Sequence, residues 1–232
     1  MSRVPVRDGE PPGLQEAVVW SKASPDRSAA ASGRLAIEVI IMSGGIVEQE
    51  SQGSTSHRFG ATVWLTGLPS AGKSTLATEL AGRARRDSRA VEVLDGDDVR
   101  SWLTPDLGFS REDRDANVVR VGRVAHLLAR NGVLVLVPVI APYVASREVV
   151  RELHEQAGLA FVEVHVSTSL EECQRRDAKG LYARQRSRSL SGLTGVDDPY
   201  EIPPAPALRL DTETMLDAAD VLETKLRALG HL

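Results

Sequence analysis

The sequence has one cysteine, few aromatic residues and no long apolar run, and each shortage excludes a class of protein. The single cysteine, Cys173, excludes an internal disulfide framework and a cysteine-rich metal site, and it favours a cytoplasmic protein. The five histidines lack the spacing of metal ligands, so no zinc site is expected. The longest apolar run, residues 133–141, is far shorter than the ~20 residues of a membrane-spanning helix. No apolar stretch follows Arg3 and Arg7 directly, so the pattern of a secretory signal is absent.

Lysine is also scarce. The 28 basic residues include only four lysines, which are Lys22, Lys73, Lys179 and Lys225. The formal net charge of −4 does not indicate a protein that binds polyanions over its whole surface, so no nucleic-acid partner is expected. An arginine bias is often a property of genome composition, but it makes the position of each remaining lysine informative.

The 232 residues suffice for one domain with an extension or for two small domains. Residues 1–57 are rich in serine, alanine, glycine and proline, and we predict a flexible or partly disordered extension with one short strand at 35–42. Met42 is an alternative start, which would leave residues 1–41 outside the native protein. Residues 58–232 show regular patterning and are predicted to form a single α/β domain.

Apolar runs and helical periodicity alternate along this second part. We expect strands at 61–66, 91–95, 133–140, 161–166 and 208–212. We expect helices at 73–86, 112–130, 148–156, 170–176 and 213–229. The alternation predicts a parallel sheet of about five strands with helices on both faces, and ligands bind such sheets at the carboxyl ends of the strands. Residues 177–206 form a long glycine-, proline- and arginine-rich segment. This segment lacks interleaved aromatics, so a mobile lid over a phosphate site is a better interpretation than a nucleic-acid patch.

A glycine-rich turn follows the first of these strands and precedes the first helix. Residues 67–74 match G-x-x-x-x-G-K-[ST], the phosphate-binding loop of P-loop NTPases. Its glycines let backbone amides point at phosphate oxygens, and the helix N-terminus adds positive potential. Lysine at this position reaches the terminal phosphates, and the following hydroxyl binds Mg²⁺. The predicted ATP-binding residues are Gly67, Leu68, Pro69, Ser70, Ala71, Gly72, Lys73, Ser74 and Thr75.

Two carboxylates, Asp95 and Asp97, end the second strand. This edge of the sheet also carries the phosphate-binding loop, so one carboxylate can hold Mg²⁺ and the other can orient a hydroxyl group. We predict Lys73, Asp95 and Asp97 as catalytic, with Ser74 and one of the two aspartates as metal ligands. Arg100, Arg114, Arg120 and Arg147 follow at wide spacing; taken singly, each would be a solvated surface group.

From about residue 59 onward the chain resembles adenylylsulfate (APS) kinases. The motifs WLTGLPSAGKST, LDGDDVR, DLGFSREDRDANVVRVGRVAHLLARNG, IAPY, RDAKGLYARQR and TGVDDPYE stand in the family's order. The resemblance implies transfer of the ATP γ-phosphoryl group to the 3′-hydroxyl of adenosine 5′-phosphosulfate, which gives PAPS and ADP in sulfate assimilation. It also implies a Mg²⁺ cofactor with Ser74 and Asp97 as its ligands, where Asp97 binds the ion or orients the hydroxyl group. It further implies a lid contact from Lys179 and a contact of Arg176 on the ATP side. The APS-binding positions that it implies are Asp97, Arg100, Phe109, Arg114, Asn117, Ile140, Ala141, Lys179 and Leu193.

Three positions depart from the family pattern. Ala141 replaces a serine that can carry phosphate in many members, although direct in-line transfer does not need that serine. Leu193 replaces a phenylalanine that sandwiches the APS adenine together with the residue at position 109. The loss of one stacking partner is worth roughly 0.5–1.5 kcal/mol and alters affinity or selectivity. The PYVASR segment keeps only the second of two arginines that some members carry, Arg147.

Two alternatives to an APS kinase remain open at this point. One is a related P-loop kinase with a different small-molecule acceptor, and the other is a nucleotide-binding regulatory protein without transfer activity. ATP and APS are the expected small-molecule partners. An associated ATP sulfurylase is compatible with the family, and so is a homodimer.

Overall fold

The computed structural model describes residues 39–42, 45–48 and 60–232, which belong to two units, residues 1–54 and 55–232. In the first unit, β1 (Val39–Met42) and β2 (Gly45–Glu48) form an antiparallel hairpin that pairs Met42 with Gly45. The strand β1 occupies the second half of the strand predicted at 35–42. The strand β2 was not predicted, because the sequence becomes more polar after Met42. The predicted flexible extension otherwise lies outside the described residues.

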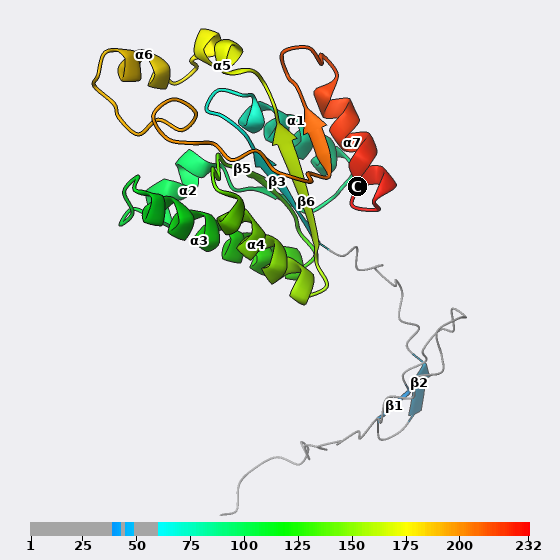
Figure 1. Cartoon of the computed structure of the whole chain (residues 1–232). Helices are drawn as coiled ribbons and strands as arrows, with labels where there is room; N and C mark the ends of the chain where they lie inside the picture. The colour runs from blue at the N-terminus through cyan, green and yellow to red at the C-terminus, as the bar shows by residue number, and fades with distance from the viewer. Residues whose placement is uncertain (1–38, 43–44, 49–59) are drawn as a thin grey trace, which may run out of the picture. The chain divides into compact units, whose positions relative to one another are not determined.

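The second unit is built on one fully parallel sheet (Figure 1). Its strands are β3 (Ala61–Thr66), β4 (Val91–Val93), β5 (Leu134–Pro138), β6 (Ala160–Val166) and β7 (Leu208–Leu210). Their order across the sheet is β4-β5-β3-β6-β7, so β3 lies at the centre between β5 and β6. The predicted sheet of about five parallel strands is therefore confirmed. The carboxyl end of β3, where the phosphate-binding loop begins, lies at the middle of the sheet edge.

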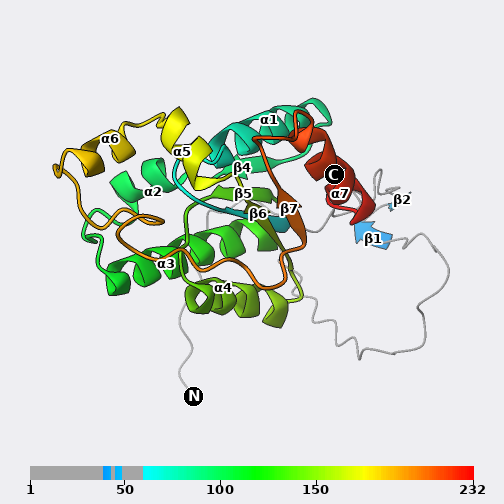
Figure 2. The ribbon, with the colours of Figure 1, turned by 45° about the horizontal axis from the view of Figure 1, so that its top comes forward.

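Helices cover both faces of this sheet (Figure 2). They are α1 (Lys73–Arg86), α2 (Gly96–Trp102), α3 (Arg111–Arg130), α4 (Val144–Gln156), α5 (Leu170–Arg176), α6 (Leu181–Arg186) and α7 (Ala218–Ala228). Helices α1 and α7 pack on one face, and α3 and α4 pack on the other. In the part of the chain that the structure describes, no helix is long and apolar enough to cross a membrane.

The alternation of side chains along β3 divides the core into two layers. Val63 and Leu65 lie in the cluster that includes Leu80 of α1 and Leu222 of α7. Trp64 points to the opposite face, in the cluster of α3 and α4. Both faces of every central strand are thus buried, which is why the strands are almost continuously apolar in sequence.

Several boundaries differ from the prediction because tertiary contacts set them. The strand β4 ends at Val93, and Asp95 turns to cap α2 by accepting a hydrogen bond from the amide of Asp97. Helix α6 was missed; the Asp177 carboxylate accepts hydrogen bonds from two amides of its first turn. Helix α4 begins four residues before its predicted start, where Glu201 accepts a hydrogen bond from the amide of Val144. Helix α7 begins five residues after its predicted start, because Asp211 organises a turn ahead of it.

Gly122 lets α3 approach α4 closely, and this contact gives a stability prediction. A Cβ atom at position 122 would lie 2.4 Å from Cγ2 of buried Val150. We expect Gly122→Ala to lower the free energy of unfolding by about 1–3 kcal/mol through overpacking. Gly82 in α1 is the matched control, because a Cβ there meets nothing nearer than an Arg86 nitrogen at 3.9 Å.

Gly82→Ala should instead raise the free energy of unfolding by about 0.5–1 kcal/mol through helix propensity. Urea unfolding of both variants checks this pair. Destabilisation of the two variants by the same amount would contradict the packing argument.

Candidate active site

The phosphate-binding loop runs from the end of β3 into α1 with an unusual backbone. Ser70 has φ 61° and Gly72 has φ 99°, both in the left-handed region. Gly72 caps α1, and a Cβ there would lie 3.1 Å from the Thr212 hydroxyl, so glycine suits both the angle and the space. The loop is fixed from outside by the Tyr182 hydroxyl of α6, which donates to the carbonyl of Pro69 at 3.1 Å. The amides at the start of α1 can therefore face a phosphate group.

Lys73 is the first residue of α1, and its ammonium group curls back over the loop. Its Nζ donates to the carbonyls of Gly67 at 2.9 Å and Leu68 at 2.7 Å. The side chain is buried, and this burial lowers the pKa of Lys73 to about 8. A cation held inside the curve of the loop is well placed to meet the terminal phosphates of a nucleotide.

The two aspartates have separate partners. Asp95 accepts a 2.5 Å hydrogen bond from the Ser74 hydroxyl, and its other oxygen caps α2. Asp97 forms an ion pair with Lys179, which lies between α5 and α6. Ser74 and Asp97 were the predicted metal ligands, but the hydrogen bond of Ser74 goes to Asp95. Hydroxyl and carboxylate oxygens are suitable ligands for Mg²⁺.

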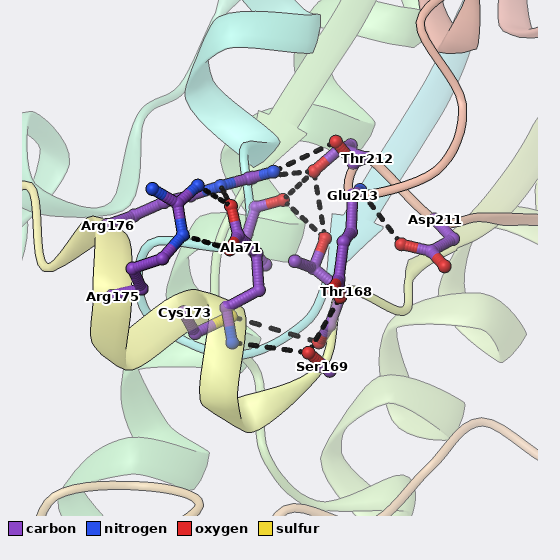
Figure 3. A network of polar contacts seen from close by, with 10 residues as sticks. Ala71, Thr168, Ser169, Cys173, Arg175, Arg176, Asp211, Thr212 and Glu213 are labelled. Atoms are coloured by element: carbon purple, nitrogen blue, oxygen red, sulfur yellow. Dashed lines mark hydrogen bonds and ion pairs between the residues drawn. The ribbon is translucent and has the colours of Figure 1, made fainter.

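A polar network joins α5 to the loop on the other side (Figure 3). Arg176 donates to the hydroxyl of Thr212 at 2.8 Å and to its carbonyl at 2.9 Å. The hydroxyls of Thr212 and Thr168 both donate to the carbonyl of Ala71, at 2.8 and 3.0 Å. Glu172 pairs with Arg176 at 2.7 Å and holds it in place. The network therefore ties the predicted ATP-side arginine to the phosphate-binding loop.

Residues of α2 and α3 form the predicted acceptor side. Phe109 is 66% exposed, and the Arg100 guanidinium lies 4.4 Å from its ring centroid. Burial lowers the pKa of Arg100, and the charge of Arg114 lowers it further. Arg114 is buried and donates to the carbonyls of Phe109 and Gly192 and to the Thr194 hydroxyl, at 2.8, 2.5 and 2.6 Å. An ion pair of 3.2 Å joins it to Asp198.

The remaining predicted acceptor residues differ in their surroundings. The Asn117 side chain accepts a hydrogen bond of 2.8 Å from the Thr104 hydroxyl. The carbonyl of Ile140 accepts one of 2.6 Å from Thr66 at the end of β3. Ala141 is buried and has φ 43°. Leu193 is buried within the core cluster that includes Tyr182, whereas Phe109 stands exposed.

The structure thus brings the loop, Asp95, Asp97, Lys179 and Arg176 to one edge of the sheet. Arg120 lies at the surface with its side chain 41% exposed and pairs with Asp106, as expected for a surface arginine. Arg147 is different: it is 2% exposed and lies in a buried ion pair with Glu163. The sequence prediction missed three threonines of the site, Thr66, Thr168 and Thr212. Each lies at or just beyond the carboxyl end of a parallel strand, where ligands bind such sheets, so their position could have indicated them.

The central strand, the loop and the helix that follows it define a P-loop nucleotide-binding fold, and the adjacent carboxylates and cations are typical of phosphotransferases. The sequence profile of the family described as Adenylylsulphate kinase matches residues 59–211. The chain belongs to the adenylylsulphate kinase family.

Adenylyl-sulfate kinases from several organisms are similar in sequence to this chain over most of its length. The adenylyl-sulfate kinase of a Picosynechococcus strain is 49% identical over 178 residues, which are 76% of this chain and 98% of the relative. That of Myxococcus xanthus is 50% identical over 176 residues, covering 75% and 94%. Among solved structures, the Mycobacterium tuberculosis APS kinase in complex with AMPPNP and APS has a TM-score of 0.70 and 43% identity, over 72% of this chain and 98% of that one. The chain is therefore an ATP-dependent kinase of this family.

Proposed function

We propose that this chain transfers the γ-phosphoryl group of ATP to the 3′-hydroxyl of adenosine 5′-phosphosulfate. We also propose that the two substrates bind on different sides of the site. ATP binds the loop of residues 67–75 and Arg176, and APS binds the α2–α3 side. The observation that carries the proposal is the position of Asp97 and Lys179. Their ion pair links the first turn of α2 to the lid segment, two residues from the Asp95 that accepts the hydrogen bond of Ser74. The 3′-hydroxyl of APS, which attacks the γ-phosphate of ATP, would lie next to both charged groups there.

Each side chain then has a physical role in the transfer. Lys73 neutralises charge on the transferring group, since phosphoryl transfer depends on positioning and electrostatic stabilisation. Asp97 accepts the hydrogen bond of the acceptor hydroxyl and orients it for in-line attack. Arg100 holds the anionic part of APS, whereas Arg114 holds the loop around residues 192–198 against Phe109. Phe109 offers its exposed face to the adenine. Lys179, Asn117 and the backbone at Ile140 and Ala141 complete the acceptor side.

A divalent cation fits the oxygen donors at this edge. Mg²⁺ in kinases is held by one or two protein oxygens together with phosphates and water. Ser74 and one aspartate, either Asp95 or Asp97, would hold it, and it would supply charge neutralisation on the β- and γ-phosphates. Among the described residues, no group of three or more histidine, cysteine, aspartate or glutamate side chains is placed to hold a metal ion.

Some parts of the proposal concern the whole molecule. The domain boundary at residues 57–58, the lid motion of residues 177–206 and the cytoplasmic location remain predictions. Association with ATP sulfurylase and formation of a homodimer also remain predictions; the related APS kinase of Thiobacillus denitrificans is hexameric.

Product analysis tests the reaction directly. Incubation of the protein with ATP, Mg²⁺ and APS should give stoichiometric PAPS and ADP, which anion-exchange chromatography separates. Turnover with another alcohol but not with APS would favour the kinase with a different acceptor. Binding of ATP without turnover of any acceptor would favour the regulatory protein.

The lowered pKa of Lys73 gives a pH prediction. The protonated form is the one that attracts phosphate, and burial lowers its pKa to about 8. We therefore expect kcat/KM for ATP to be constant below pH 8 and to fall as pH rises through that value. Initial rates at limiting ATP between pH 6.5 and 10 check this.

Lys73→Arg is the comparison, because a guanidinium stays charged throughout this range. Any activity that remains in this variant should lack the alkaline decline. A wild-type profile that stays flat to pH 10 would contradict the assignment.

A further inference from the structure

The segment after β5 and the end of the lid are joined along a short seam, which we define as residues 140–144 facing residues 200–201. The carbonyl of Pro142 accepts a hydrogen bond of 2.8 Å from the amide of Glu201. The Glu201 carboxylate in turn accepts one of 2.7 Å from the amide of Val144. The hydroxyls of Thr66 and Tyr200 lie 3.0 Å apart, and Thr66 donates to the carbonyl of Ile140. The acceptor-side backbone is thus attached to the lid at successive residues.

Arg147 of α4 lies beneath this seam and contacts both of its sides. Its Nη1 donates to the carbonyl of Ala141 at 2.6 Å, and its Nη2 donates to the carbonyl of Glu201 at 2.8 Å. Its Nε donates to Glu163 of β6 at 2.9 Å, and both side chains of this pair are almost fully buried. A guanidinium can donate these three hydrogen bonds at the same time because its N–H groups form a rigid planar fork.

The backbone at Ala141 requires such support. Its φ of 43° lies in the left-handed region, which a residue with a Cβ atom rarely adopts. Strained conformations of this kind persist only when the surroundings over-determine them, and they are frequent at ligand sites. The carbonyls of Ile140 and Ala141 both accept hydrogen bonds from protein side chains, from Thr66 and Arg147, so neither carbonyl is free to rotate.

We propose that Arg147 is a positioning residue for the acceptor: it fixes the left-handed turn at Ala141 and couples this turn to the end of the lid. The inference rests on the proposed function only in that residues 140–141 line the APS side. Arg147 itself touches neither substrate. Its contribution should therefore appear in the use of APS and leave the use of ATP almost unchanged.

A neighbouring arginine provides a matched control. Arg151 lies one turn further along α4 and pairs with the other oxygen of the same Glu163, at 2.6 Å. It donates to no carbonyl of the seam among the contacts of the described residues. Arg147→Lys and Arg151→Lys thus make the same change beside the same carboxylate, and only the first removes the fork from Ala141 and Glu201.

The test compares KM for APS, KM for ATP and thermal unfolding in wild type, Arg147→Lys and Arg151→Lys. We expect Arg147→Lys to raise KM for APS roughly tenfold or more, as for a lost charge-assisted hydrogen bond, with KM for ATP within about twofold of wild type. Arg151→Lys should leave both constants near wild type. Glu201→Ala removes only the side-chain bond of the seam, which the carboxylate accepts from the amide of Val144, and keeps both backbone bonds of residue 201. It should therefore also raise KM for APS alone, by a smaller factor than Arg147→Lys.

Three results would overturn the inference. One is a lower melting temperature of Arg147→Lys without a change in KM for APS. Another is an equal rise of KM for APS in Arg151→Lys, and the last is an equal rise of both KM values in Arg147→Lys. If Arg147→Lys does not fold, a wild-type KM for APS in Glu201→Ala has the same consequence. Failure of the proposed function is seen separately, as absence of PAPS formation by wild type.

Discussion

Lys73→Met should lower kcat by about 10²–10³-fold, the typical loss when one preorganised donor to a developing charge is removed. Lys73 places its ammonium group inside the phosphate-binding loop, within 2.9 Å of the carbonyls of Gly67 and Leu68. Burial lowers its pKa, which means that the protein bears a cost to keep this cation out of water. An uncharged side chain of similar length removes that cost, so the melting temperature should stay the same or rise.

The sequence supplies its own control for this variant. Lys225 lies in the last turn of α7, and Lys225→Met should leave PAPS formation at the wild-type rate. Initial rates of PAPS formation and thermal unfolding followed by circular dichroism provide the two measurements. Loss of activity together with a large loss of stability in Lys73→Met would show that the lysine has mainly a structural role.

Arg114→Met should lower kcat/KM for APS by about a hundredfold or more, which corresponds to about 3 kcal/mol of transition-state stabilisation. Arg114 connects α3 to the loop of residues 192–198 through Gly192, Thr194 and Asp198. It also donates to the carbonyl of Phe109, the exposed ring on the acceptor side. Removal of the guanidinium leaves two partly buried carbonyls and a carboxylate without this donor, so the loop and the ring should both lose their fixed positions.

The effect should be confined to one substrate. KM for ATP should change by less than about threefold, because the loop of residues 67–75 makes no hydrogen bond to Arg114 among the described contacts. Arg120→Met is the control on the same helix, because Arg120 forms a solvent-exposed pair with Asp106, and such surface pairs contribute little to stability. An equal loss for both substrates in Arg114→Met would contradict the role in acceptor binding.

The strands of the parallel sheet and the phosphate-binding loop could be predicted because local sequence sets them. Strand β3 (Ala61–Thr66) and helix α1 (Lys73–Arg86) begin and end where the pattern predicted. The apolar run of β3 is buried on both faces, α1 buries one apolar face, and Gly72 permits the left-handed backbone at the start of α1. Arg147 shows the opposite case: a single arginine in an arginine-rich chain predicts a surface residue. Its burial depends on Glu163, which is 16 residues away on β6, whereas Arg147 lies on α4.

Local sequence is therefore sufficient to predict the alternating α/β pattern, the loop that holds Lys73 and the pair Asp95 and Asp97, since each depends on neighbours along the chain. The partner of each side chain is instead set by the packing of the folded protein. This packing joins Ser74 to Asp95, Asp97 to Lys179 and Arg147 to the two sides of the seam. These pairings link residues from different elements, and their distances follow from how the helices pack on the sheet, which no local pattern contains.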